Sequence, residues 1–427
     1  MTRIITVEEI TRVEGNGAIE VEIEGNEVRS VRMRVLEGPR FFESLLTGIS
    51  YEKVPDVVRR ICAICTASHA LASITAIEKA FKVEVTPQTR LLRDLLIHGE
   101  MVESHALHLF LLALPDVLGY TDIVAMTDKY APQVKAALGL KAAGNMVHVA
   151  LGGREIHGVN ERVGGFSTIP SEGELQKIRD ALASSKSAAK LAVELFAKSE
   201  APTYTESENA YMALDPGERF GFLGESVLTS VGGSHPVEEY LGLTNERAVR
   251  HSNAKFSTYR GREFMVGSLP RVLLNGSKLE GDASALFREN RGKLRADNSL
   301  NNNLAQAVEL LHAVDRSIED IDRLLSDGVR KEVPMEVETK AGRGVGTVEA
   351  PRGLLYHDYT FDEEGRIVSA NVITPTAQNL ANIEKDYKIA AGRLVKESDD
   401  KIRASLEVIA RAYDPCISCS VHLVRLS

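Results

Sequence analysis

The 427-residue sequence is long enough to bury a sizeable core, and its length alone allows one large domain or two or three ordinary ones. Hydrophobic residues make up 44% and charged residues 26% of the chain, as in soluble globular proteins, and we identify no run of about 18 apolar residues that could span a bilayer. The formal net charge of -9 and the lack of a basic stripe exclude nucleic-acid binding that depends on neutralising phosphates.

Residues 1–15 contain no basic patch followed by an apolar run, so we expect no secretory signal.

The number and spacing of the cysteines indicate the chemistry of the protein. Four cysteines are too few for a disulfide scaffold. They form two C-x-x-C pairs near opposite ends of the chain, Cys62 with Cys65 and Cys416 with Cys419. This pattern predicts metal or redox chemistry.

The chain starts with strands and continues with helices. Apolar and polar residues alternate over 4–35, with a turn at Gly25-Asn26, which predicts a small antiparallel sheet. Pro55-Asp56 is typical of a helix start, and apolar residues then recur at helical spacing to about Phe81. The first cysteine pair is therefore expected in the opening turns of this helix.

A long buried helix is predicted from Thr86-Pro87 to about Leu114, because apolar residues occupy more than one of its faces. Another helix, over about 172–200, begins at the capping box formed by Ser171 and Glu174. Further helices are expected at about 122–150, 283–327 and 378–412.

Two glycine-rich and polar segments, 152–170 and 201–265, are too long for simple connections, so we expect them to run over the surface or to contact a partner. From Met335 to Thr374 the pattern again alternates, with a hairpin turn at Glu363-Glu364-Gly365. We predict one domain over residues 1–427 of the mainly helical α+β class. It would have a large central helix bundle and small antiparallel sheets made of strands from the N-terminal and C-terminal regions.

The two cysteine pairs can supply four thiolates, a soft ligand set suited to zinc, iron–sulfur clusters or another thiophilic metal. A histidine follows each pair, His69 and His422. Structural zinc is the ordinary interpretation of such pairs. Zinc ribbons, however, place their pairs about 15–20 residues apart, whereas nearly the whole chain separates these two. A core of this size needs no metal to hold it together, so the spacing favours a redox metal.

The neighbours of the cysteines make the pattern specific. Arg60-Ile-Cys-Ala-Ile-Cys-Thr-Ala-Ser-His69 and Asp414-Pro-Cys-Ile-Ser-Cys-Ser-Val-His422 resemble the two signatures of the nickel–iron hydrogenase large, catalytic subunit. Three further segments stand in the order that this family has them, namely Thr11-Arg-Val-Glu-Gly15, Glu349-Ala-Pro-Arg-Gly353 and Thr374-Pro-Thr-Ala-Gln-Asn379. The resemblance covers the whole chain.

The resemblance implies a nickel–iron centre for reversible cleavage of dihydrogen into protons and electrons. All four cysteines would bind nickel, and Cys65 and Cys419 would also bind an iron that carries carbon monoxide and cyanide. The Cys416 thiolate would accept the proton and Glu14 would carry it outward. Without the resemblance, Glu14 would be an ordinary solvated charge.

Other residues are implied around the centre. Arg352 would lie over the open metal position, paired with Asp414, although a pKa above about 12 makes proton transfer by it costly. Thr376 and the backbone after Pro375 would hydrogen-bond a cyanide, with Pro351 nearby. His69 would hydrogen-bond a thiolate.

A second, hard cation is implied as well. Glu43, the backbone carbonyl of Val372 and His422 fall where the family holds a magnesium or iron. This cation would fix the C-terminal segment over the centre, which explains the position of His422 so close to the end of the sequence.

All four cysteines would then be used, leaving none for an iron–sulfur cluster, so a small iron–sulfur subunit must carry the electrons away. Ala63, Phe41 and Asn16 depart from residues common in the membrane-associated periplasmic branch, and Ser104 stands where that branch keeps an aspartate. They favour the soluble cytoplasmic branch, which includes NAD(P)-linked enzymes and sulfhydrogenase alpha subunits and has further flavin- and NAD(P)-binding partners. The competing hypotheses are a zinc-binding interaction protein and a metal-free coupling subunit like that of respiratory complex I, which lacks the four cysteines.

Overall fold

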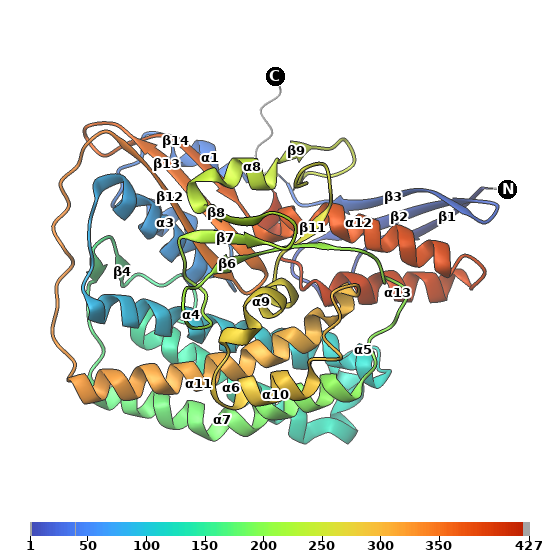
Figure 1. The fold of residues 1–427 in the computed structure, drawn as a ribbon, viewed down its shortest axis with the longest axis horizontal. Coiled ribbons are helices and arrows are strands. Elements are labelled where there is room, and N and C mark those ends of the chain that lie inside the picture. The colour runs from blue at the N-terminus through green and yellow to red at the C-terminus, as the bar shows by residue number, and fades with distance from the viewer. Residues whose placement is uncertain (1, 39, 422–427) are drawn as a thin grey trace.

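Long helices form the centre of the computed structural model, which describes residues 2–38 and 40–421 (Figure 1). They pack side by side, α4 against α6 and α11, and α7 against α6 and α11. The bounds of these central helices are α4 Pro87–Leu107, α6 Ile123–Gly152, α7 Glu172–Lys198 and α11 Asn302–Asp327. The four helices contribute many of the buried apolar side chains of the main core, and helices dominate the described chain, so the predicted helical core is confirmed.

Helix α4 begins as predicted, because the Thr86 hydroxyl accepts the N–H of Thr89 at 3.0 Å. It continues through a π-helical turn, His108–Ala113, into α5, Leu114–Leu118. An 18-residue window of the stretch Pro87–Leu118 has a mean hydropathy of 1.3, so this helix is long and apolar enough for a membrane span by length and composition alone. Since 67% of its most apolar window is buried in the protein, the stretch has the properties of a core helix.

The capping residues define the neighbouring helices. Asp122 accepts the N–H of Ala125 at 2.9 Å at the start of α6, which kinks at Tyr130. The capping box at the start of α7 is present, and both helices confirm their predictions. Where α6 crosses α4, a Cβ on Gly144 would lie 2.7 Å from the backbone N of Glu103, so the crossing requires glycine.

Two predicted helices are each divided in two. The segment predicted over 283–327 contains α10, Gly281–Asn290, and the separate helix α11. The Asn298 side chain between them accepts the N–H of Leu300 and starts a new turn. The segment predicted over 378–412 contains α12, Pro375–Arg393, and α13, Asp399–Ala412, which starts at the Ser398 N-cap. Polar side chains that bond nearby backbone groups thus interrupt the helical pattern in both places.

The remaining helices are short or flank the bundle. They are α1 Phe42–Leu46, α2 Val54–Val58, α3 Thr66–Phe81, α8 Tyr240–Thr244 and α9 Ser268–Asn275. Single 3₁₀ turns occur at Val237–Glu239, Gly276–Lys278, Ser299–Asn301 and Ser418–Ser420.

The predicted terminal strands form two separate antiparallel sheets (Figure 1). Their strands are β1 Thr2–Val7, β2 Gly17–Glu24 and β3 Glu27–Val35 in the first, and β12 Gly342–Ala350, β13 Gly353–Phe361 and β14 Ile367–Ile373 in the second. The second sheet starts later than Met335, because residues 328–341 run as an extended segment from the end of α11. Glycines let β12 approach α3 closely: a Cβ on Gly344 or Gly346 would lie 2.0 Å from a carbonyl oxygen of α3.

The segment 201–265 forms a third sheet, which contradicts its prediction as a surface excursion. Its strands, in the order β11-β6-β7-β8, are β6 Ala210–Asp215, β7 Ser226–Thr229, β8 Gly233–Pro236 and β11 Phe264–Met265. Met212 and Phe264 are fully buried in a second apolar cluster that also includes Leu354 of β13. Glycines interrupt the short alternating runs of this segment, so the sequence pattern did not predict its strands. Two-stranded ribbons complete the fold, β4 Glu161–Arg162 with β5 Gly165–Phe166 and β9 Arg247–Ala248 with β10 Lys255–Phe256.

Candidate metal centre

The first cysteine pair lies in a loop between α2 and α3, not in the opening turns of a helix as predicted. Helix α2 ends at Val58, and α3 begins only at Thr66, with Cys65 as its N-cap. The Cys62 sulfur accepts the backbone N–H of Cys65 at 3.2 Å. This bond offers the backbone an alternative to helix and folds the loop so that both sulfurs face inward.

The second pair follows α13 and is held by residues from the N-terminal region and from α12. The backbone N–H of Cys416 donates to the Thr376 hydroxyl at 2.9 Å. The next N–H, that of Ile417, donates to the carbonyl oxygen of Glu14 at 2.9 Å. A Cβ on Gly15 would lie 2.8 Å from the backbone N of Ser418, and Gly15 has a φ of 82°, so glycine is required at this approach.

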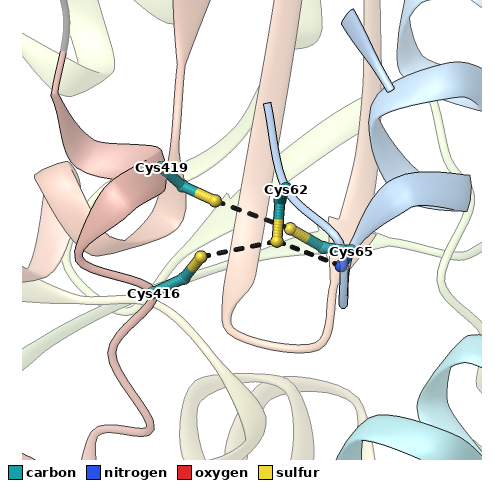
Figure 2. A group of neighbouring side chains, drawn as sticks. All are labelled: Cys62, Cys65, Cys416 and Cys419. Atoms are coloured by element: carbon teal, nitrogen blue, oxygen red, sulfur yellow. Dashed lines mark hydrogen bonds between the residues drawn. The ribbon is translucent and has the colours of Figure 1, made fainter. Parts of the chain in front are cut away.

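The four cysteine sulfurs converge although the pairs are far apart in the sequence (Figure 2). Cys62 and Cys416 lie 3.5 Å apart between sulfurs, and Cys65 and Cys419 lie 3.8 Å apart. All four sulfurs are within 4.8 Å of one another, and all four residues are buried. The thiols are free rather than joined in disulfides. The donor set is the soft, four-thiolate arrangement that thiophilic metals require.

The electrostatics of the cluster favour a bound cation. Burial raises the pKa of Cys416 to about 11, and it also holds the pKa values of Cys65 and Cys419 well above their ordinary value. For Cys62, burial is outweighed by hydrogen bonds from the other three thiols and by the charge of Arg352, so its pKa is lowered. Without a metal, the site therefore stabilises one thiolate among thiols. Four thiolates need positive charge at the centre of the cluster, which a soft metal supplies.

Arg352 lies in the turn between β12 and β13 beside the sulfurs. Its Nε donates to the Asp414 carbonyl oxygen at 2.8 Å and its Nη2 to the Asp414 carboxylate at 2.9 Å. Burial lowers the pKa of Arg352, but Asp414 and the neighbouring thiolates outweigh burial and hold this pKa well above its ordinary value. Its Nη1 is buried without a partner among the described residues, so one N–H group is left to bind a molecule at the cluster.

Asp414 is fixed in turn from the helix bundle. The Gln306 side-chain amide of α11 donates to the second oxygen of Asp414 at 3.0 Å. The Gln306 carbonyl oxygen lies 2.5 Å from Nδ1 of His108, whose Nε2 lies 2.7 Å from the Arg411 carbonyl oxygen. Sequence patterns did not single out Gln306 or His108, because their partners come from distant helices.

Glu14 is half-buried and lies against the second cysteine pair. Its carboxylate accepts the backbone N–H of Ser418 at 3.1 Å and the Ser418 hydroxyl at 2.5 Å. Because Ser418 lies between Cys416 and Cys419, this carboxylate is at the outer side of the cysteine segment with some exposure to solvent. This is the position needed by a group that passes protons between the cluster and water.

His69 is fully buried on α3, one turn after Cys65. Its Nδ1 lies 3.0 Å from Nε2 of His357 in β13, which in turn contacts the Tyr359 hydroxyl. Burial lowers the pKa of His69 to about 4, so the ring is neutral near pH 7. The described contacts thus connect His69 to β13, and its hydrogen bond to a thiolate stays a prediction.

Glu100 is a positioning residue that the sequence analysis missed. Its buried carboxylate, from α4, accepts the backbone N–H groups of Ala67 and Ser68 at 2.7 and 3.1 Å, and also the Ser68 hydroxyl. It thereby caps the first turn of α3, immediately after Cys65. Burial raises the pKa of Glu100 to about 8. The sequence carried no signal for this role, because Glu100 is one of several acidic residues on a largely apolar helix.

Two prolines and a threonine are among the residues predicted near the metal centre. Pro375 is the first residue of α12 and Thr376, the acceptor for Cys416, is the second. Pro351 lies next to Arg352, and its carbonyl oxygen accepts Nη2 of Arg271 at 3.0 Å. Thr376 therefore contacts the second cysteine pair directly, while Pro375 and Pro351 adjoin Thr376 and Arg352 in the chain.

The predicted hard-cation site is only partly described. The Glu43 carboxylate accepts the backbone N–H of Val372 at 3.0 Å, so these two residues are together as expected. Lys255 also lies there, with its Nζ 3.8 Å from Glu43 and 2.9 Å from Glu246. These side chains line a cavity of about 580 Å³. His422 lies outside the described residues.

Comparison with known proteins gives the family. The model of the nickel-dependent hydrogenase family matches residues 40–175 and 172–422. The alpha subunit of sulfhydrogenase 2 from Pyrococcus furiosus is 44% identical over 433 residues, covering 99% of this chain and all of the relative. The beta subunit of the NAD-reducing hydrogenase HoxS from Cupriavidus necator is 27% identical, covering 99% of this chain and 96% of the relative.

Solved structures show the same fold. The crystal structure of an NAD⁺-reducing [NiFe]-hydrogenase in the H₂-reduced state superimposes with a TM-score of 0.88 at 25% identity, covering 98% of this chain and 99% of that one. The Ni-Fe-Se hydrogenase from D. vulgaris Hildenborough superimposes with a TM-score of 0.79 at 20% identity, covering 99% and 100%. The predicted fold class is confirmed.

Proposed function

This chain belongs to the nickel-dependent hydrogenase family, and we propose that it is the catalytic subunit that splits and forms dihydrogen at a nickel–iron centre held by its four cysteines. The observation that carries the proposal is the convergence of four free, buried sulfurs within 4.8 Å. The second is the buried Nη1 group of Arg352 beside them, which has no partner in the part of the chain that the structure describes. Both features fit a bound soft metal with a reactive position.

The ligand assignment is the one that the family resemblance implies. The four thiolates would hold nickel, Cys65 and Cys419 would also hold iron, and that iron would carry carbon monoxide and cyanide. The Thr376 hydroxyl and the backbone after Pro375 would hydrogen-bond a cyanide, with Pro351 nearby. When bound, the metals supply the Lewis acidity that polarises dihydrogen and an acceptor for its electrons.

Residues of this chain carry the proton from the cluster to solvent. The Cys416 sulfur accepts it from dihydrogen, and the Glu14 carboxylate receives it and passes it towards solvent. The hydrogen bonds from the Ser418 backbone N–H and hydroxyl fix the Glu14 carboxylate beside the cysteine segment. Arg352 stays protonated because Asp414 and the thiolates stabilise its charge. Its Nη1 group, which has no partner among the described residues, is available to donate a hydrogen bond to a molecule bound at the cluster. We do not assign it the role of base.

A magnesium or iron bound by Glu43, the Val372 carbonyl and His422 would fix the C-terminal segment. Glu43 and Glu246 bring two carboxylates to one cavity, and hard cations prefer such oxygen ligands. Lys255 already supplies one positive charge between them. The cation would therefore have a structural role.

Electrons must leave through another chain. The four cysteines are the only ones in the sequence, and all are in the cluster. A small iron–sulfur subunit therefore receives the electrons, followed by flavin- and NAD(P)-binding subunits in a cytoplasmic complex. The relatives named as NAD-reducing hydrogenases support NAD(P) as the final carrier.

Metal analysis combined with infrared spectroscopy of the purified complex tests the proposal. We expect nickel and iron in the preparation, absorption in the carbon monoxide and cyanide stretch region, and dihydrogen-dependent reduction of an artificial acceptor. Zinc alone, with an empty stretch region, would instead support a structural zinc protein. A preparation without any bound metal would support a coupling subunit of the complex I type.

A further inference from the structure

Four buried polar side chains form a row that starts one turn after the first cysteine pair. His69 and Ser73 lie one turn apart on α3, and His357 and Tyr359 lie two residues apart on β13, so each pair shares one face of its element. All four residues are fully buried. The mechanism proposed above gives no part to His357, Tyr359 or Ser73.

Hydrogen bonds connect the row from one end to the other. Nδ1 of His69 lies 3.0 Å from Nε2 of His357, and Nδ1 of His357 lies 2.5 Å from the Tyr359 hydroxyl. That hydroxyl lies 3.3 Å from the Ser73 hydroxyl. Two facing imidazole nitrogens form a bond only if one of them carries hydrogen, and a neutral imidazole has a single ring N–H. The donor at one end of the row therefore decides the tautomer of both rings.

The Tyr359 hydroxyl sets the direction of the row. Burial raises the pKa of Tyr359 above its ordinary value, so the hydroxyl keeps its proton. An imidazole nitrogen is a stronger acceptor than a serine hydroxyl, and the contact with His357 is the shorter of the two, so Tyr359 donates to Nδ1 of His357. Nε2 of His357 then carries the hydrogen and donates to Nδ1 of His69. The single ring hydrogen of His69 is consequently on Nε2.

His69 is within electrostatic reach of the cysteine cluster. Burial lowers the pKa of His69, whereas the Cys62 thiolate raises it to a smaller extent. A neutral ring with hydrogen on Nε2 can donate that hydrogen to a thiolate. A ring with hydrogen on Nδ1 would instead turn a lone pair towards the thiolates, which repel it. The tautomer of His69 therefore determines whether this ring stabilises the thiolate form of the cluster.

We propose that His357 and Tyr359 are positioning residues that fix the tautomer of His69, so that its Nε2–H group is presented to the thiolates of the cluster. The proposal rests on the proposed function. A hydrogen bond to a thiolate withdraws electron density from the sulfur, and hydrogen bonds to sulfur ligands tune the reduction potential of the metals they hold. Without the Tyr359 hydroxyl, both directions of the row become accessible and this hydrogen bond is weakened.

Tyr359→Phe tests the direction of the row. Tyr356→Phe on the same strand is the matched control, because Tyr356 is also fully buried and its hydroxyl has no partner among the described residues. In complexes that retain nickel and iron, we expect the infrared carbon monoxide stretch of Tyr359→Phe to move to lower wavenumber and turnover to fall about tenfold. The stretch should not move in Tyr356→Phe. An unchanged stretch in Tyr359→Phe, or an equal shift in the control, would overturn the proposal.

His357→Gln provides a rescue experiment. The glutamine amide can donate to Nδ1 of His69 without any help from Tyr359. We expect a carbon monoxide stretch close to that of the wild type, and no further shift when Tyr359→Phe is added to His357→Gln. A further shift in the double variant would contradict a role of Tyr359 through His357.

Nitrogen NMR of the histidine-labelled wild-type complex determines the tautomer directly, and it depends neither on activity nor on how a variant folds. Ring nitrogens with and without hydrogen resonate far apart, and the His69 signals are identified by their loss in His69→Gln. We expect hydrogen on Nε2 of His69 and none on its Nδ1. Hydrogen on Nδ1 would overturn the positioning role and leave the proposed function standing, whereas a wild-type complex without nickel would contradict the function itself.

Discussion

Two candidate cation sites in this molecule differ in how completely the fold prepares them. The four-cysteine site consists of Cys62, Cys65, Cys416 and Cys419, buried and within reach of one another. The Glu43 site consists of Glu43, Glu246 and Lys255, which line a cavity, and of the Val372 backbone bonded to Glu43. In the first, the Arg352 charge favours only the Cys62 thiolate, so four thiolates still require a metal, whereas in the second Lys255 already compensates two carboxylates.

This difference shows how far each site is ordered before a metal binds. The cysteine loops are fixed by backbone bonds, by the Glu100 cap and by the glycines of β12, so little order remains to be gained when metal binds. At the Glu43 site the ion pair holds the side chains without a metal. We therefore expect changes at the first site to abolish activity and changes at the second to affect stability.

The largest effect is expected from Cys62→Ser. A serine hydroxyl is a hard, weakly acidic ligand, so nickel should be lost and hydrogenase activity should fall at least about 10⁴-fold, as when one member of a unit is removed. Metal content and dihydrogen oxidation measure this. Ala63→Ser, next in the same loop, is the control and should keep both; nickel retained in Cys62→Ser would contradict the assignment.

Glu14→Gln should keep both metals while isotope exchange between dihydrogen and solvent falls about 10²–10⁴-fold, because an amide cannot carry the proton. The glutamine can still accept a hydrogen bond from Ser418, so the fold is retained. Exchange followed by mass spectrometry gives the rate, with the exposed Glu9→Gln as control. Unchanged exchange would remove Glu14 from the proton path.

Arg352→Lys keeps the charge but loses the fork of N–H groups that binds Asp414 and leaves one group free. We expect a decrease in turnover of about 10–100-fold with nickel still bound. The exposed Arg366→Lys should have no effect. Full activity in Arg352→Lys would show that only the charge at this position is required.

Glu100→Gln tests the cap that orders the first cysteine loop. The glutamine amide keeps one oxygen and places an NH₂ donor where the other carboxyl oxygen accepts, so one N–H group of Ala67 or Ser68 loses its acceptor. The free energy of unfolding should fall by about 1–3 kcal/mol. Chemical denaturation measures the loss, and Glu103→Gln on the same helix is the matched control. An equal loss in both variants would argue against a specific cap.

The smallest effect is expected at the Glu43 site. If wild-type protein binds Mg²⁺ there, a concentration ten times the dissociation constant raises the free energy of unfolding by about 1.4 kcal/mol. Glu43→Gln should remove this increase and leave dihydrogen oxidation nearly unchanged. Thermal unfolding with and without Mg²⁺ measures it. The same increase in both proteins would place the cation elsewhere.

Local signals predicted most of the fold. The caps at Thr86 and Ser171 and the turn at Glu363-Glu364-Gly365 define elements that the structure contains, because each depends on nearby residues. The cysteine loop was predicted as helix, since the bond from the Cys65 N–H to the Cys62 sulfur has no periodic signature. The third sheet was missed for a similar reason, because its strands are short and are completed by pairing across distant segments.

The site was predictable to the extent that motifs carry it. The cysteine pairs, Glu14, Arg352 and Thr376 all stand in short segments that resemble family signatures, and the structure brings them together. Glu100, Gln306 and His108 were missed because they act through tertiary contacts between helices. Residues of this kind become visible only when the helices are packed.

X-ray absorption at the nickel edge tests the central claim most directly. Its fine structure reports which atoms surround the metal in the intact complex. We predict sulfur as the dominant neighbour of nickel, from the four cysteines. A nickel surrounded by nitrogen and oxygen, or no nickel edge in the active complex, would contradict the account.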